Sequence, residues 1–414
     1  MSVDRTQGKA ELPHLPTEFP PESDFINFDA NLTEGERAIR KKVRDFMETE
    51  VRGKIDDMVD EAKFPTHLLP KLAATGLVGG CVGGYGAPGL TLMETAMACT
   101  EMARVDASVA TLYMVHGGLA MESIAICGSE EQKQRFFTDM TSFKKIGCFC
   151  LTEPDFGSDA SSLQTIARKV PGGYEISGKK RWIGNGTLAD VIVVWARNDQ
   201  TNQVQGFIVE GGAPGLTLRT IKNKIALRMV QNAHMTFNKV FVPDRNVMPK
   251  GRTFATGVGK ALQLSRVFVG WLPVGICMGA YDAALAYLKK RTQFGAPLAA
   301  YQLMQEKLVR MLGTIQAMWL LAERVTRMVE QGTARMEHIT MVKAWNSLRG
   351  REVVALAREV VGGNGIVLEY GVAKSFCDME AVYTYEGSYE VNTLVTGRAI
   401  TGLSAFKARN KKSK

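Results

Sequence analysis

The chain has 414 residues, of which 45% are hydrophobic and 22% charged, and this near-average composition excludes a disordered or fibrous protein. The formal net charge is +9, but five of the basic residues lie in the last eight positions, so the rest of the chain is only mildly basic and nucleic acid is not an expected partner. No uninterrupted apolar run approaches the ~20 residues of a membrane span, which predicts a soluble protein of two or three domains.

The first part of the chain, residues 29–145, is predicted to be a helical domain. Thr33 and Glu36 form a capping box ahead of apolar residues at helical spacing, and Ser129 begins another helix in the same way. The glycine-rich stretch 79–89 contains a G-x-G-x-x-G pattern, but a dinucleotide site needs a strand before these glycines. Because a helical segment precedes them here, we interpret the stretch as a tight surface turn.

The pattern changes at residue 146 and again near residue 254. Residues 146–250 contain short alternating or apolar runs between turn residues, which predicts a central β domain, either a small barrel or a sandwich. The expected strands cover residues 148–152, 174–177, 191–196, 207–210, 216–221 and 235–242. Long helical patterns over 254–406 predict a C-terminal helical bundle, followed by a basic tail at 407–414. The predicted fold class is therefore mainly α with a central β domain.

The cysteines and histidines do not indicate a disulfide framework or a metal site. The seven cysteines are an odd number without a C-x-x-C pair, and Cys148 and Cys150 alternate so that they share one face of a strand. Free thiols in a reducing compartment are the expected state. The five histidines show no metal-ligand spacing, so no metal is predicted.

Two stretches have a composition that chemistry could use. Residues 151–159 are polar and glycine-bearing at the exit of an apolar strand, and residues 383–389 set Glu386 among tyrosines. Either stretch could be no more than a capped turn. A carboxylate in an aromatic pocket has its charged form disfavoured, however, and its raised pKa suits a general base.

With these residues in view, the chain resembles the acyl-CoA dehydrogenase and oxidase flavoproteins from about residue 29 to residue 406. The resemblance implies an N-terminal helical domain, a central β domain and a C-terminal four-helix bundle, usually in a homotetramer. Its strongest signatures are the segments Leu151–Asp159, Lys180–Asn185, Arg291–Gly295, Gly362–Gly365 and Tyr385–Gly387.

Three further stretches are most similar to plant peroxisomal short-chain acyl-CoA oxidases: Arg228–Gln231, Gln293–Pro297 and Thr396–Arg398. The implied activity is FAD-dependent α,β-dehydrogenation of short-chain acyl-CoA to trans-2-enoyl-CoA in fatty acid β-oxidation, with oxygen as the acceptor and hydrogen peroxide as product. The alternative is an acyl-CoA or glutaryl-CoA-like dehydrogenase that passes electrons to an electron-transfer flavoprotein. The resemblance favours the peroxisome over the mitochondrion or cytosol, although the terminal Lys412-Ser413-Lys414 does not match a Ser-Lys-Leu address.

The resemblance also assigns roles to individual residues. Glu386 is the implied base that removes the α proton, because Ser265 occupies the position where some relatives place it instead. Ser158 and Arg266 fall where the family contacts the CoA thioester. The residues expected to hold FAD are Cys150, Leu151 and Thr152 at the isoalloxazine edge, Trp182, Ile183 and Gly184 along the ring, Arg291 and Gln302 reaching the pyrophosphate from a neighbouring subunit, Gly362 and Gly363 near that pyrophosphate, and Ser388 and Glu390 just past the base.

One departure from the family bears on the substrate. Relatives that act on glutaryl-CoA carry an arginine a few residues after a Val-Asp pair, where it pairs with the free carboxylate of the substrate. Here the pair Val105-Asp106 is followed by Ala110. A methyl group cannot offset a buried carboxylate, so the sequence favours a monocarboxylic short or medium acyl chain.

Overall fold

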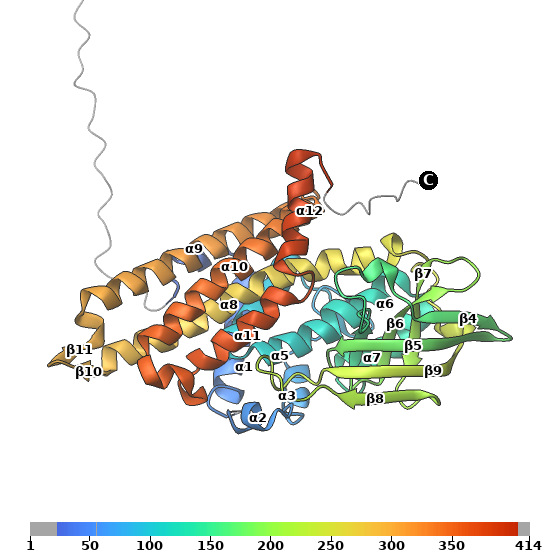
Figure 1. Ribbon diagram of the computed structural model, residues 1–414, viewed down its shortest axis with the longest axis horizontal. Coiled ribbons are helices and arrows are strands. Elements are labelled where there is room, and N and C mark those ends of the chain that lie inside the picture. The colour runs from blue at the N-terminus through green and yellow to red at the C-terminus, as the bar shows by residue number, and fades with distance from the viewer. Residues whose placement is uncertain (1–22, 55, 405–414) are drawn as a thin grey trace, which may run out of the picture.

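The computed structural model describes residues 23–54 and 56–404, and the predicted basic tail 407–414 lies outside them. Figure 1 shows an elongated molecule with a β-sheet at one end and long helices running from it towards the other. The predicted fold class is confirmed, because helical regions precede and follow a central sheet. The predicted domain boundaries stay predictions.

The N-terminal region consists of helices packed against the C-terminal bundle. Thr33, Thr91 and Ser129 each begin a helix with a reciprocal capping box, as the sequence predicts for the first and last of them. The glycine-rich stretch 79–89 contains a small hairpin, β1 (Gly83–Gly84) with β2 (Ala87–Pro88), which confirms the turn. The helices are η1 (Phe28–Asn31), α1 (Glu34–Glu50), α2 (Asp56–Glu61), α3 (Leu68–Ala74), α4 (Leu92–Val105), α5 (Ala107–Tyr113), η2 (Met114–Met121), α6 (Glu122–Cys127) and α7 (Glu130–Thr141).

The β domain forms one seven-stranded curled sheet in the order β3-β6-β4-β5-β9-β8, with β7 paired to β6. All six predicted strands are present, and β4 is a strand that the sequence pattern did not indicate. Apolar residues of β6 and β7 are buried on both faces, because helices cover one side and the curled sheet the other. The strands are β3 (Gly147–Cys150), β4 (Ile166–Val170), β5 (Gly173–Ile183), β6 (Val191–Asn198), β7 (Val204–Glu210), β8 (Leu216–Thr220) and β9 (Ala233–Pro243).

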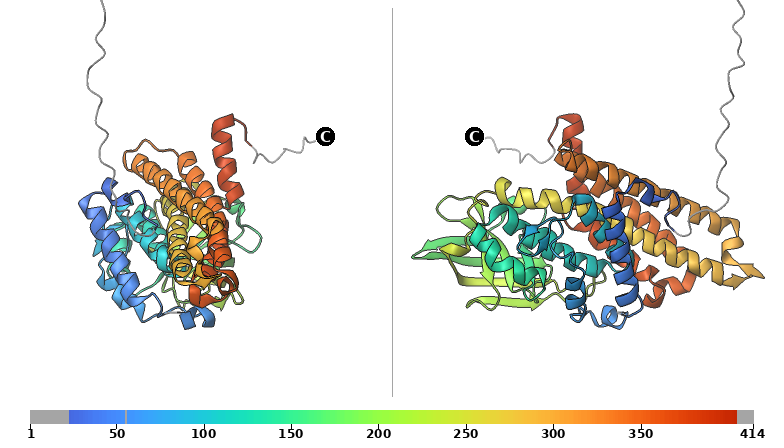
Figure 2. Two further views of the ribbon diagram at one scale, coloured as in Figure 1. Left: turned by 90° about the vertical axis from the view of Figure 1, so that its left-hand side faces the viewer. Right: turned by 180° about the vertical axis from the view of Figure 1, so that it is seen from behind.

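The C-terminal region is a bundle of long helices followed by a protruding one. The short hairpin β10 (Thr292–Gln293) with β11 (Ala296–Pro297) joins the first two long helices at the end of the bundle away from the sheet (Figures 1 and 2). The helices are η3 (Ala160–Ser162) and η4 (Asp244–Asn246) in the β domain, then η5 (Ala255–Gly259), α8 (Lys260–Lys290), η6 (Leu298–Ala300), α9 (Gln302–Glu330), α10 (Met336–Val360), η7 (Gly362–Ile366), η8 (Leu368–Tyr370), α11 (Val372–Thr384) and α12 (Tyr389–Thr401).

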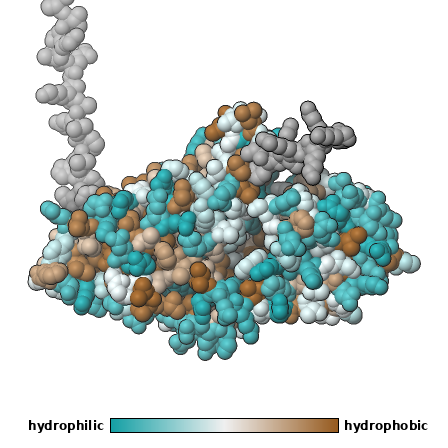
Figure 3. Space-filling view, viewed as in Figure 1, coloured by the Kyte–Doolittle hydropathy of each residue, from teal (hydrophilic) through white to brown (hydrophobic). Residues whose placement is uncertain are grey.

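Helix α12 packs against α10 on one side and projects beyond the rest of the bundle (Figure 1). Asn392 is its only buried residue among those described, while Leu394 and Ile400 are exposed. Figure 3 shows hydrophobic surface on this protruding helix, and Figure 2 shows that it projects beyond the bundle in two further views.

Two helical stretches are long and apolar enough to cross a membrane, residues 107–127 and 255–290. Their most apolar windows are 72% and 78% buried inside the protein, respectively. Residues 107–127 pack against both the sheet and α8, and residues 255–290 contain α8, which is enclosed by α4, α9 and α10. The hydrophobicity of both stretches is therefore accounted for by contacts within the chain.

Candidate active site

Glu386 lies in the short connection between α11 and α12, against α8. The hydroxyl of Ser265 on α8 donates a hydrogen bond to Glu386 Oε2 over 3.1 Å. The neighbouring Arg266 donates from Nε to the backbone oxygen of Glu386 over 3.2 Å. The position that the resemblance names as an alternative place for the base therefore contacts the carboxylate itself.

The backbone at Glu386 is held in an unusual conformation. Its φ is 56° and that of Gly387 is 82°, so two consecutive residues adopt the left-handed region. For a non-glycine residue this conformation costs of order 1 kcal/mol or more and persists only where the surroundings impose it. Such strained residues concentrate at functional sites, which supports a chemical role for Glu386.

The electrostatic environment of Glu386 suits a base. Burial raises the pKa of its carboxyl above the usual value, while Arg266, the Ser265 hydrogen bond and Lys343 lower it. Burial therefore makes the carboxylate a better proton acceptor, while the flanking positive charges and the Ser265 hydroxyl favour its ionised form.

A second cluster forms where β3 and β5 end side by side. The backbone N–H of Arg181 donates to the carbonyl of Thr152 over 2.9 Å, which places Leu151 and Thr152 beside Trp182. The Trp182 side chain is 50% exposed and its φ is 63°, so the indole is turned outward by the backbone instead of packing in the core. A half-exposed indole provides a stacking surface for a flat aromatic ligand.

A buried ion pair supports this cluster from beneath. Lys180 Nζ donates to Glu153 Oε1 over 3.0 Å and to the carbonyl of Leu151 over 2.8 Å. Glu153 in turn accepts from the backbone N–H groups of Gln164 and Thr165. Because every group in this pair has several partners, the pair fixes the geometry at the ends of β3 and β5.

The π-helix η2 joins the two clusters. Gly184 packs closely against Val115, because a Cβ there would lie 3.1 Å from Val115 Cγ2, which is tighter than an ordinary contact. On another side of η2, Gly118 faces Phe268, which lies two residues after Arg266 on α8. The segment that carries Trp182 and the helix that carries Arg266 are thus packed on the same short element, and π-helical turns are frequent at functional sites.

Four of the predicted FAD residues lie elsewhere. Arg291 and Gln302 flank the exposed hairpin at the far end of the bundle, and Gly362 and Gly363 follow α10 at that same end (Figure 1). The other end of α10 contacts the base region, because Met336 Sδ accepts from Arg266 Nη1 over 3.6 Å. A helix of 25 residues is about 37 Å long, so one chain does not bring these four residues to Trp182 or Glu386.

The remaining predicted residues have mixed placements. Cys150 is buried in β3, with its sulfur 3.9 Å from that of Cys148 and 3.3 Å from Met235 Sδ, which confirms that the two cysteines share a face. Ser388 caps α12 by accepting from the Val391 N–H, and Glu390 is exposed in its first turn. Ser158 is exposed in the loop after β3.

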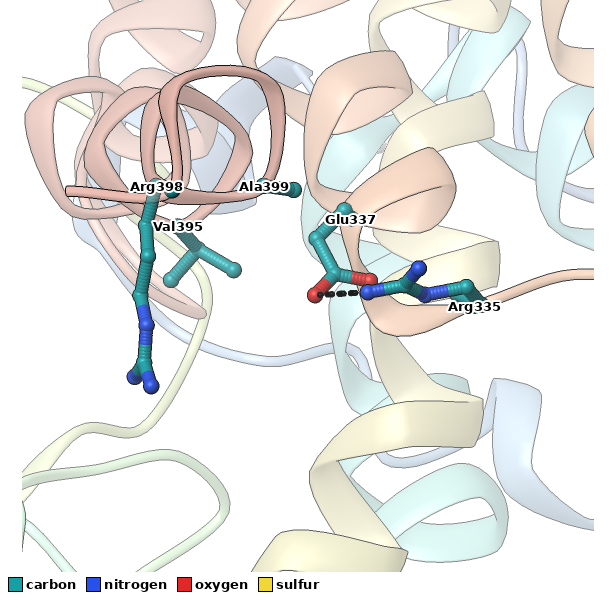
Figure 4. Close-up of a pocket in the computed structure, with 6 residues that line it drawn as sticks. Arg335, Glu337, Val395, Arg398 and Ala399 are labelled. Atoms are coloured by element: carbon teal, nitrogen blue, oxygen red, sulfur yellow. Dashed lines mark hydrogen bonds and ion pairs between the residues drawn. The ribbon is translucent and has the colours of Figure 1, made fainter. Parts of the chain in front are cut away.

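A cavity of about 430 Å³ lies between α12 and the beginning of α10. In Figure 4 the Arg335 guanidinium pairs with Glu337 while Arg398 points away from them. None of the predicted site residues lines this cavity. It is nonetheless a neighbour of the base region, because Met336, which contacts Arg266, lies between Arg335 and Glu337 in the chain.

Comparison with known proteins places this arrangement in a family. Models of the acyl-CoA dehydrogenase N-terminal, middle and C-terminal domains match residues 33–144, 148–240 and 256–401. The chain belongs to the acyl-CoA dehydrogenase family. The members of this family are FAD-dependent oxidoreductases that act on CH–CH bonds, and this chain is such an enzyme.

Individual relatives share most of the chain. An acyl-CoA dehydrogenase from Bacillus subtilis is 30% identical over 90% of this chain and 99% of its own length. The structure of glutaryl-CoA dehydrogenase from Mycobacterium smegmatis superposes with a TM-score of 0.90 at 35% identity, over 93% of this chain and 100% of the other. A structure of a glutaryl-CoA dehydrogenase from the same organism in complex with FADH2 gives a TM-score of 0.89 at 32% identity, over 92% and 98%. Butyryl-CoA dehydrogenase from Megasphaera elsdenii gives a TM-score of 0.85 at 30% identity, over 89% and 99%. All of these are named dehydrogenases, so the resemblance to plant peroxisomal oxidases is not supported by them.

FAD is the cofactor of this family, and the cluster around Trp182 fits it. The outward indole, the adjoining backbone of Leu151 and Thr152, and the side-chain-free Gly184 leave a flat surface of the kind that an isoalloxazine ring requires. The buried Arg181 Nε, which has no hydrogen-bond partner among the described residues, adds an unused donor next to that surface.

Several residues that shape this site were not identified from the sequence. They are Lys343 and Asn392 at the base, Lys180 beneath Trp182, and the buried Asp106–Lys374–Asp378 cluster that ties α11 to α5. A lysine at an otherwise apolar position of a helix, as at Lys343 between Val342 and Ala344, is the one signal that could have indicated such a role.

Proposed function

We propose that this protein is an acyl-CoA dehydrogenase that oxidises short-chain monocarboxylic acyl-CoA to trans-2-enoyl-CoA and passes the electrons to an electron-transfer flavoprotein. The observation that carries the proposal is the position of Glu386, whose backbone is strained and which contacts Ser265 and Arg266 of α8. Helix α8 and the predicted flavin surface both pack against the π-helix η2. The relatives named as dehydrogenases support this acceptor over oxygen.

Each residue of the site has its own role in the proposed reaction. Glu386 takes the proton from the α carbon of the acyl group, and the C–H electron pair then forms the new double bond as a hydride leaves the β carbon. FAD, when bound against Trp182, Leu151 and Thr152, supplies the two-electron acceptor for that hydride. The Ser265 hydroxyl orients the carboxylate, and Arg266 fixes the backbone from which it projects.

The acyl chain is proposed to end near α5. Tyr385, the residue before the base, lies against Thr111, and Ala110 precedes Thr111 on the same helix. Ala110 is fully buried, so a substrate carboxylate that reached it would lose its hydration without gaining a cation from this position. This supports a monocarboxylic substrate even though one relative is named for glutaryl-CoA.

A homotetramer would complete the cofactor site. Arg291, Gln302, Gly362 and Gly363 lie too far from Trp182 to act within one chain, and the exposed apolar residues of α12 leave a surface for a second copy. Both observations support the expectation that a neighbouring subunit contributes to FAD binding. Light scattering of the holoprotein tests the assembly, and a monomer that retains FAD would contradict it.

The proposed activity is tested by mixing the FAD-loaded protein with butyryl-CoA without oxygen and following the visible absorbance of the flavin. We expect rapid bleaching, followed by slow recovery in air and fast recovery with an electron-transfer flavoprotein. Fast recovery in air with one hydrogen peroxide per turnover would instead establish the oxidase. A flavin that no straight-chain acyl-CoA bleaches would contradict both.

An oxidase would also be expected in the peroxisome. Imaging a fusion tagged at the N-terminus, which leaves residues 407–414 free, tests this location. A mitochondrial or cytosolic signal would agree with the dehydrogenase and contradict the peroxisomal assignment.

A further inference from the structure

The loop that carries Glu386 is held by donors from three helices. Lys343 Nζ on α10 donates to the carbonyls of Tyr383 and Gly387 over 3.0 and 2.7 Å. Asn392 Nδ2 on α12 donates to the carbonyls of Gly387 and Ser388 over 2.7 and 3.1 Å. Together with Arg266 on α8, these contacts fix the carbonyl groups on both sides of the left-handed Glu386 and Gly387.

Lys343 is the unusual member of this set. The residue is fully buried, and within the described chain no carboxylate lies within ion-pair distance of its ammonium group. Burying an ammonium group without an ion pair is costly, and a methionine at this position would pack without that cost. The two carbonyls that it reaches belong to residues 383 and 387, on either side of Glu386.

The charges that face Lys343 come from three elements. Glu386 from the loop and Glu390 from α12 stabilise its charged form, while Arg266 from α8 opposes it. Burial is the larger influence and lowers the pKa of Lys343 to about 7. In return, Lys343 lowers the pKa of Glu386. The two groups therefore influence one another electrostatically although they form no direct ion pair.

We propose that Lys343 is a positioning residue for the reaction: its hydrogen bonds hold the strained Glu386 loop, and its ammonium charge, when the group is protonated, favours the ionised form of Glu386. This inference rests on the proposed function, in which Glu386 is the base. It assigns two separable roles, because a neutral side chain with an amide donor could keep a hydrogen bond but would lose the charge.

Two substitutions separate these roles. Lys343→Met removes both the donors and the charge, whereas Lys343→Gln removes the charge and keeps a donor. Asn346→Leu is the matched control, because Asn346 is buried one turn further along α10 and donates to the carbonyls of Gly270 and Met318, away from the loop. All three variants disturb the packing of α10, but only the first two alter the hydrogen bonds that hold the loop around Glu386.

The charge role is tested by the pH dependence of flavin reduction by butyryl-CoA. We expect the acid limb of kcat/KM to move to higher pH by roughly one unit in both Lys343 variants, the lower end of the effect of a nearby opposite charge. Asn346→Leu should leave the limb in place. An unchanged acid limb in Lys343→Gln, in an enzyme that still requires Glu386, would overturn the charge role while leaving the proposed function intact.

The loop role is tested by hydrogen exchange of the peptide spanning residues 383–392, a measurement that needs no acyl-CoA. We expect exchange to be at least tenfold faster in Lys343→Met than in wild type, with Lys343→Gln in between and Asn346→Leu unchanged at this peptide. Should Lys343→Met not fold, Lys343→Gln against Asn346→Leu decides the same question. Equal protection of the peptide in the Lys343 variants and wild type would overturn the loop role, whether or not the enzyme oxidises acyl-CoA.

Discussion

Ser265 and Glu386 lie 121 residues apart in the chain and meet over 3.1 Å, hydroxyl to carboxylate. Because the hydroxyl donates, it stabilises the ionised carboxylate and lowers the pKa that burial raises. The hydrogen bond also fixes which oxygen of Glu386 remains free to accept a proton. A small residue on α8 thus contributes both to the orientation and to the charge state of the proposed base.

The first prediction is that Glu386→Gln retains FAD but loses flavin reduction. An amide is nearly isosteric with the carboxyl group and cannot accept the α proton, so the rate should fall by roughly a hundredfold to ten-thousandfold. Stopped-flow absorbance with butyryl-CoA measures the loss. Glu380→Gln is the matched control, because Glu380 is on α11 and pairs with the surface residue Arg351. A variant at Glu386 that reduces its flavin at the wild-type rate would show that the base lies elsewhere.

The second prediction concerns Ser265. Replacing it with alanine removes the hydrogen bond to Glu386 Oε2, so the pKa of the base rises and the acid limb of kcat/KM moves to higher pH. Below this limb the variant should lose several-fold in kcat/KM, and well above it most of the activity should return. Ser265→Thr keeps the hydroxyl and should behave like wild type. An alanine variant with an unshifted acid limb would mean that the hydrogen bond is absent in the functioning enzyme.

Features that depend on neighbouring residues could be predicted from the sequence, whereas features that depend on residues far apart in the chain could not. The capping boxes at Thr33 and Ser129 were predictable because their partners lie three residues away. The strands were predictable from alternation, but their order was not, since β3 pairs in parallel with β6 across residues that carry no pairing signal.

The same division applies to the site residues. Glu386 stands among tyrosines that are adjacent in the chain, so the sequence could single it out, and its role as the base, which the resemblance implies, stays a prediction. The role of Lys343 could not be predicted, because it depends on two backbone carbonyls more than 39 residues away and backbone groups leave no trace in a sequence. The π-helix η2 was also missed, since the apolar periodicity over residues 107–127 does not distinguish a π-helical turn from an α-helix.

The third prediction concerns stability at acidic pH and rests on His116, which is fully buried on η2. Its Nδ1 accepts from the Gly147 N–H over 2.9 Å, so the ring proton lies on Nε2, which donates to the carbonyl of Met140 over 3.0 Å. Burial lowers the pKa of His116 from 6.5 to about 4. As the pH falls below 6.5, His116 is protonated in the unfolded chain but stays neutral in the folded one. The free energy of unfolding therefore decreases by about 1.4 kcal/mol per pH unit.

His116→Gln tests this loss, because an amide side chain accepts and donates once each and does not titrate. Glu122 gives the opposite slope, since burial raises its pKa to about 7 and its contribution to stability is lost as pH rises from 4.5 through 7. The free energy of unfolding, measured with urea between pH 5 and 6.5, should therefore change little with pH in wild type. It should fall with rising pH in His116→Gln, where only Glu122 acts, and rise with pH in Glu122→Gln, where only His116 acts. Parallel curves for all three proteins would contradict both assignments.

The last prediction is about substrate choice and rests on Ala110. Pentanoyl-CoA and glutaryl-CoA have acyl chains of the same length and differ in the distal carboxylate, so comparing them isolates the effect of that charge. We expect the acyl pocket to end at α5 without a cation. The glutaryl carboxylate must then be buried without a partner, or the glutaryl chain must bind less deeply, and either costs several kcal/mol. A cost of ~3 kcal/mol corresponds to roughly a hundredfold in kcat/KM.

We therefore expect pentanoyl-CoA and butyryl-CoA to exceed glutaryl-CoA by about that factor when kcat/KM is measured side by side. The difference in kcat/KM should persist at high salt, because the cost of burying the glutaryl carboxylate is little affected by screening. An effect of distant surface arginines on glutaryl-CoA would instead weaken as salt is added. Raising the pH from 6 to 8 should leave the ratio unchanged, since a carboxylate with an ordinary pKa near 4 is already ionised throughout this range. Equal efficiency with pentanoyl-CoA and glutaryl-CoA would show that another basic residue reaches the end of the pocket or that the carboxylate stays in water, and either outcome would remove Ala110 as the determinant of specificity.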